Sequence, residues 1–67
     1  MRKDKIIGLI EDRLLTLDDQ YSDYLASWAS DTDVTHSRYY VGCMNIINEE
    51  VTYLQRLKKV IEKDRAS

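Results

Sequence analysis

The chain has 67 residues, with 10 basic and 12 acidic side chains, a formal net charge of −2, two glycines and no proline. Because so short a chain buries only about 60% of the surface that it exposes when unfolded, its core is marginal without a disulfide, a metal ion or self-association. Cys43 is the only cysteine and His36 the only histidine, which excludes an internal disulfide and a zinc site of the usual ligand count. Self-association is therefore the expected source of additional stability.

An apolar content of 43% beside 33% charged residues is typical of a folded protein and not of a disordered one. No apolar run is long enough to span a membrane, and the apolar residues 6–10 lead directly into charged ones, without a small-residue cleavage site. We therefore expect a cytoplasmic protein with no membrane partner.

Apolar residues in the first half of the chain recur at alternating spacings of three and four, which is the heptad pattern of a coiled-coil helix. This spacing predicts a helix over about residues 3–30. Without proline, and with glycine only at positions 8 and 42, the sequence has none of the signals that end strands, so the expected class is all-α. The apolar seam of this first helix consists of Ile7, Ile10, Leu14, Leu17, Tyr21, Tyr24 and Trp28.

One stretch in the middle of the chain is rich in side chains that compete with the helix backbone and cap helix ends. It predicts a turn over about residues 31–35, centred on Val34. Asp31, Asp33 and Thr35 are each able to accept the free amide hydrogens at the start of a following helix. A single uninterrupted helix is the alternative, but the first seam, continued through this stretch, does not meet the apolar residues that follow.

The second half of the chain shows the same spacing in mirror order and predicts a helix over about residues 36–64. Residue pairs across the expected turn, such as Leu14 with Leu54, have numbers that add up to 68 along both seams, as two antiparallel helices joined by one turn require. The expected fold is therefore an antiparallel two-helix hairpin of coiled-coil type that forms a single domain. We name the second seam the inner seam: Tyr40, Met44, Ile47, Val51, Leu54, Lys58 and Ile61.

A further apolar stripe lies beside the inner seam, about 100° around the second helix. One partner helix cannot cover both, and burying a Leu, Ile or Val side chain is worth about 1.5–3 kcal/mol, so the extra stripe requires a partner. We expect a homodimer that forms a four-helix bundle, or else a groove or helix on a different protein. We name this surface the outer stripe: Tyr39, Cys43, Ile46, Glu50, Tyr53, Leu57 and Val60.

The candidates for self-association are the members Cys43, Ile46, Tyr53, Leu57 and Val60. Glu50 interrupts the outer stripe, and in a dimer core its carboxylate requires a basic side chain from the other subunit or an exposed edge.

Charge is divided between the two ends of the expected hairpin. Aspartates gather toward the turn, whereas the open end carries basic residues from both termini. An acidic face that is functional would bind a protein with a basic patch, and otherwise it keeps the chain soluble. The basic end could touch phosphates, but an isoelectric point of about 5.2 makes nucleic acid the poorest candidate partner. The candidate partner-binding residues are Asp18, Asp19, Asp23, Asp31 and Asp33.

The sequence specifies no recognisable catalytic chemistry. Cys43 lies on an apolar stripe and reads as a buried thiol, while His36 falls in the expected turn. Glu49 and Glu50 are adjacent and therefore diverge on a helix, and no glycine-rich phosphate loop occurs. We expect a protein that is not an enzyme and that uses no catalytic residues, metal or cofactor.

The segment Arg38-Tyr39-Tyr40-Val41-Gly42-Cys43-Met44, with its continuation through Glu50, Tyr53, Leu54 and Leu57 to Ile61, resembles a pattern in small helical proteins encoded by bacteriophages. The shared features are paired aromatic residues, a glycine two positions later and a heptad helix, over about a third of the chain. The resemblance implies a phage or prophage accessory protein that acts on a component of its host.

Taken with the lack of chemistry, these patterns favour a small interaction protein that inhibits or adapts a protein target by steric occlusion. The alternative is a structural or oligomerisation subunit without a regulatory role. Contact with nucleic acid through the basic open end is a distant third hypothesis.

Overall fold

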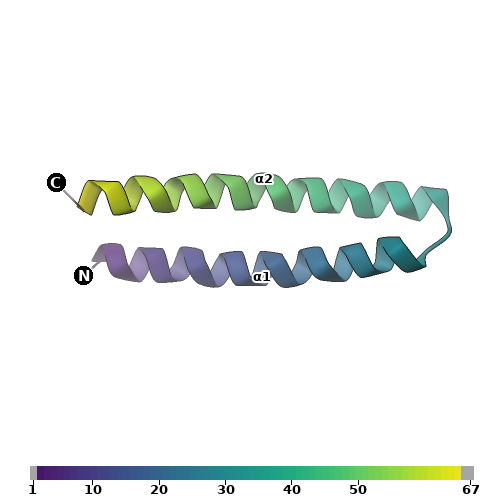
Figure 1. The fold of residues 1–67 in the computed structure, drawn as a ribbon, viewed down its shortest axis with the longest axis horizontal. Helices are drawn as coiled ribbons and strands as arrows, with labels where there is room; N and C mark the ends of the chain where they lie inside the picture. Colours follow the sequence, from purple (N-terminus) through teal and green to yellow (C-terminus); the bar gives the residue numbers. More distant parts are fainter. Residues whose placement is uncertain (1, 66–67) are drawn as a thin grey trace.

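The computed structural model describes residues 2–65, which form two helices, α1 (Arg2–Ser30) and α2 (Val34–Arg65). The helices run antiparallel, and the start of α1 and the end of α2 lie at the same end of a rod (Figure 1). The Cα atoms of this rod extend over 52 × 15 × 11 Å. The expected all-α hairpin is therefore confirmed, whereas a four-helix bundle concerns a second chain and stays a prediction.

The core lies along the line where the two seams meet. Every residue of both seams except Trp28 is buried or half-buried. Leu17, near the middle of α1, is only 1% exposed, and its burial at about 1.5–3 kcal/mol is a large share of what a hairpin of this size can gain. The core residues that the structure buries most completely are Ile7, Ile10, Leu17, Met44 and Ile47.

The prediction that Trp28 belongs to this core is wrong. Its side chain is 42% exposed, and Ser27 is the half-buried residue of that turn. The turn is centred on residue 32 and not on Val34, so residues at the same level near the turn have numbers that add up to 64 and not to 68, and Tyr40 is no longer level with Trp28. The ring of Tyr40, which we expected opposite Trp28, has its centroid 6.4 Å from that of Tyr24 instead.

The turn is shorter than predicted and comprises residues 31–33, so that Val34 and Thr35 belong to α2. Asp33 caps the helix: its carboxylate accepts a hydrogen bond from the Thr35 amide at 2.8 Å, and its carbonyl accepts one from the Ser37 amide at 2.9 Å. The Asp31 carboxylate accepts the Asp33 amide at 2.9 Å. The cap therefore places the centre of the turn before Val34, because α2 begins directly after Asp33.

Among the described residues, three ion pairs join the helices between the open end and the middle of the rod. Lys3 pairs with Asp64 at 3.0 Å and Glu11 pairs with Lys58 at 3.0 Å. Further along, Arg13 pairs with Glu50 at 2.7 Å. All involve partly exposed side chains, so each contributes little to stability, but together they are consistent with one antiparallel register.

Within residues 2–65, neither helix combines the length and the apolar character needed to cross a membrane.

Candidate protein-interaction surface

The outer stripe is an exposed apolar line along α2. Tyr39, Ile46, Tyr53 and Val60 follow one another at intervals of seven residues, or two helical turns, and each is between 62% and 67% exposed. The members between them, Cys43, Glu50 and Leu57, are half-buried because they lie closer to the line where α1 meets α2. Apolar side chains so exposed and so regularly aligned are characteristic of a surface that binds a partner.

Glu50 does not need a basic residue from another chain, contrary to one of the two expectations for it. The Arg13 side chain of α1 donates from Nε to Oε2 of Glu50 at 2.7 Å and from Nη2 to Oε1 at 3.3 Å. This two-bond contact lowers the pKa of Glu50 and raises that of Arg13. The charge that interrupts the outer stripe is therefore compensated within one hairpin.

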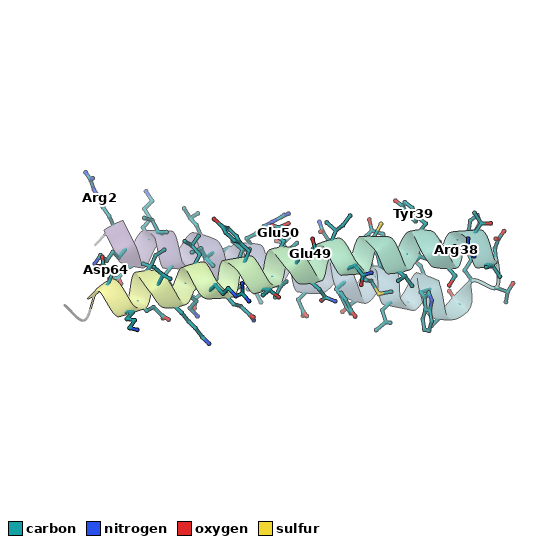
Figure 2. All side chains as sticks on the ribbon, turned by 90° about the horizontal axis from the view of Figure 1, so that it is seen from above. Arg2, Arg38, Tyr39, Glu49, Glu50 and Asp64 are labelled. Carbon is teal, nitrogen blue, oxygen red and sulfur yellow. The ribbon has the colours of Figure 1, made fainter. Side chains whose placement is uncertain are left out.

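The same ion pair shows that the surface continues onto α1. Leu9 precedes Arg13 by four residues and Ile6 precedes it by seven, so both lie on the side of α1 that Arg13 occupies, and both are exposed. Glu50, Tyr39 and Arg2 project toward the same side of the hairpin in Figure 2. Sequence analysis missed Ile6 and Leu9 because they lie off the first seam. Their spacing from Arg13 is a usable signal only once Arg13 is known to pair with Glu50.

Near the turn, aromatic rings connect this surface with the core. The ring of Tyr39 meets that of Tyr24 edge-on with centroids 6.4 Å apart and that of Tyr40 with centroids 5.7 Å apart. Hydrogen bonding with the Cys43 thiol, one turn further along α2, raises the pKa of the Tyr39 phenol. Although Tyr39 is exposed, its ring therefore packs against neighbouring rings of both helices.

The five candidate aspartates do not gather on one face. Asp18, Asp19 and Asp23 are exposed on α1, but helical spacing distributes them over about 140° of its circumference. Asp31 and Asp33 lie in the turn, where both accept hydrogen bonds that hold the backbone. The aspartates are therefore spread around the rod from the middle of α1 to the turn, an acidic pole that does not form a flat acidic patch.

Within the turn, the Asp31 carboxylate contacts two residues of α2. Its Oδ2 lies 2.8 Å from Nδ1 of His36 and accepts a long hydrogen bond of 3.5 Å from the Tyr40 hydroxyl. The Asp33 amide, followed by His36, lowers the pKa of the Asp31 carboxyl. The hydrogen bond to Asp31 raises the pKa of His36. His36 thus lies in the first turn of α2, where its side chain is exposed to solvent and paired with Asp31.

A hollow is also present, on the opposite side of the inner seam from Glu50. It is an open groove of about 330 Å³ with an apolar floor and polar rims that include Asp18, Asn48 and Gln55. In the part of the chain that the structure describes, no three His, Cys, Asp or Glu side chains come together in a way that could hold a metal ion. The outer stripe is therefore the more extensive candidate, because it follows α2 from Tyr39 to Val60.

Comparison with models of protein families, with curated proteins and with solved structures finds no match to this chain. The resemblance to small phage-encoded helical proteins therefore depends on residues 38–61 alone. Function has to be inferred from the surface that the hairpin presents.

Proposed function

We propose that this chain is a non-catalytic protein-interaction module of the cytoplasm and that the outer stripe is its binding surface. The observation that carries this proposal is the line of four side chains at seven-residue intervals, each more than 60% exposed, on a helix whose inner seam is already covered. Complementing that line requires another helical surface, because heptad spacing matches the ridges and holes of a helix.

Binding through this surface would act by covering part of the surface of the target. A rod 52 Å long that docks along its side hides a long strip of its target, so it can block a competing partner or hold two chains together. Inhibition or adaptation by steric occlusion, as the phage-like pattern implies, is one use of such a rod. Assembly of an oligomer is the second use.

The acidic pole supports the same proposal in a secondary role. Asp18, Asp19 and Asp23 are exposed in the half of α1 that leads to the turn and would attract a basic surface during encounter. Charges of this kind mainly raise the association rate and confer salt dependence, whereas desolvated apolar side chains supply most of the affinity. We therefore assign the affinity to the outer stripe and orientation to the aspartates.

The test introduces two lysines on the outer stripe and two beside it. Ile46→Lys with Tyr53→Lys is expected to abolish association, measured both with the pure protein and by capture from a bacterial lysate. Asn45→Lys with Thr52→Lys adds the same charge at exposed polar positions one residue away and is expected to leave association unchanged. Equal association of the two variants, with circular dichroism showing both folded, would contradict the proposal.

A further inference from the structure

The outer stripe is nearly symmetric about Glu50. Reversing the direction of α2 about this residue places Cys43 level with Leu57, and Ile46 within one residue of the level of Tyr53. The apolar members therefore coincide with apolar members after a two-fold rotation, which is the condition for an isologous dimer. We propose that the occupant of the outer stripe is a second copy of this chain, packed with its α2 antiparallel about a two-fold axis at Glu50. This proposal rests on the outer stripe being the binding surface.

The size of the surface is sufficient for a stable dimer. The flat side of the rod, 52 Å long and 15 Å wide between Cα atoms, has an area of about 800 Å², and a specific interface buries about that much per partner. The Arg13–Glu50 pair bridges both helices on this side, and Ile6 and Leu9 widen its apolar part at the open end. Two such sides packed together form a four-helix bundle.

The charges at the two ends select the antiparallel arrangement. Residues 2–5 and 58–64, at the open end, carry six basic and three acidic side chains. Residues 23–38, at the turn end, carry three aspartates and a single basic side chain besides His36. An antiparallel dimer places the basic end of each copy against the acidic end of the other, whereas a parallel dimer brings like charges together. The basic partner that the aspartates require is thus present on the chain itself.

The centre of the proposed interface is electrically neutral. Each Glu50 approaches its symmetry mate near the two-fold axis, and each already carries the Arg13 guanidinium as its counter-ion. A charged pair at the centre of an apolar interface costs affinity relative to an apolar pair, but it fixes the register of the dimer. A shift of one α2 helix along the other would place the charged pair against apolar side chains. The ion pair therefore acts as the register device of the dimer.

A new thiol at position 57 tests this arrangement directly. Two residues that are 14 positions apart on one helix are about 21 Å apart, so Cys43 cannot reach position 57 of its own chain. In the antiparallel dimer, however, Cys43 of one copy is level with position 57 of the other. Leu57→Cys is therefore expected to form a covalent dimer with two disulfides under mild oxidation, seen by non-reducing electrophoresis and intact mass.

Two single-thiol chains are the matched controls. The natural chain, with Cys43 alone, and the Leu57→Cys variant that also carries Cys43→Ser are both expected to stay uncrosslinked, because each thiol then faces a leucine or a serine. A parallel dimer in register predicts the opposite, namely that each single-thiol chain crosslinks to itself. Efficient crosslinking of either control, or none of the two-thiol chain, overturns the antiparallel arrangement.

The oligomeric state separates failure of this inference from failure of the proposed function. Sedimentation equilibrium at about 100 µM is expected to give a dimer for the natural chain, which requires only a micromolar Kd. Ile46→Lys with Tyr53→Lys is expected to weaken that dimer at least about a hundredfold, whereas Asn45→Lys with Thr52→Lys leaves it unchanged. A monomeric natural chain that still captures another protein through the outer stripe would refute the second copy while leaving the binding surface intact. A monomer without stripe-dependent capture would refute both.

Discussion

Ile46 and Ile47 are chemically identical neighbours on α2, yet they are 67% and 6% exposed. The difference is one step of 100° around the helix, which turns Ile47 onto α1 and Ile46 away from it. The comparison shows that one helix carries two apolar lines in different surroundings. The inner seam holds the hairpin together, whereas the outer stripe stays exposed, and we propose that it binds a partner.

Lysine substitution at each isoleucine is the strongest way to break this comparison. Ile47→Lys places a charge in the core without a counter-ion, at a cost of about 4 kcal/mol or more, and is expected to unfold a hairpin of such limited stability. Ile46→Lys is expected to keep the helical content and lose only association. Circular dichroism and sedimentation velocity on both variants provide the measurement, and a folded Ile47→Lys chain would contradict the assignment of the core.

The same contrast applies on α1, with a smaller effect. Leu17→Ala removes the most completely buried side chain and is expected to lower the free energy of unfolding by about 2–5 kcal/mol. Leu15→Ala, at an exposed position two residues earlier, is expected to change it by less than about 0.5 kcal/mol. Urea titrations of both variants at one protein concentration measure the difference. Comparable losses would mean that Leu15 is also covered.

Removal of the helix cap tests how the turn sets the register of the inner seam. Asp33→Ala deletes the acceptor of the Thr35 amide and is expected to cost about 1 kcal/mol of stability. Asp33→Asn keeps an acceptor oxygen at that position and is expected to recover most of the loss. The urea midpoints of the two variants give the measurement. If alanine and asparagine are equally destabilising, the carboxylate acts through its charge and not as the cap.

The smallest expected effect is a pH dependence of the free energy of unfolding that arises from the His36–Asp31 pair near the turn. The pKa of His36 is raised above its usual value of 6.5, so its contribution is complete below pH 6.5 and is lost as the pH rises through the folded value. The pKa of Asp31 is lowered below 3.8, so its contribution is complete above pH 3.8 and is lost as the pH falls through the folded value.

The pair therefore stabilises the hairpin most between pH 3.8 and 6.5. The difference in unfolding free energy between the natural chain and His36→Gln, followed from pH 4 to 9, isolates this contribution because the other titrating groups largely cancel. We expect the difference to be largest near pH 5 and to vanish in alkali. A difference that does not change with pH would show that His36 acts without its charge.

Heptad spacing was sufficient to predict the hairpin, because two helices pack together wherever apolar residues recur regularly on one side of each. It was insufficient at Trp28, because the turn is centred two residues earlier than predicted and Tyr40 therefore packs against Tyr24. The turn was also misplaced, since Asp31, Asp33 and Thr35 all have capping chemistry and only the fold selects among them. In these places the sequence allows several local solutions, and packing decides.

The candidate surface was predictable in part. Spacing identified the outer stripe on α2, but its extension to Ile6 and Leu9 depends on how far the two helices are rotated about each other. The sequence feature that reflects this rotation is the pairing of Arg13 with Glu50, which are 37 positions apart. Single-sequence patterns do not contain such a relationship, because many other residue pairs could equally form an ion pair.

The short turn also has a consequence for the order in which the hairpin opens and closes. Contacts between the helices join residues at steadily increasing separation along the chain, from Tyr24 with Tyr40 near the turn to Lys3 with Asp64, 61 positions apart, at the open end. The entropy lost in closing a loop grows with its length, so the pairs near the turn form first and the others follow in sequence. The hairpin should therefore open first at the end far from the turn, and amide hydrogens there should exchange fastest with solvent.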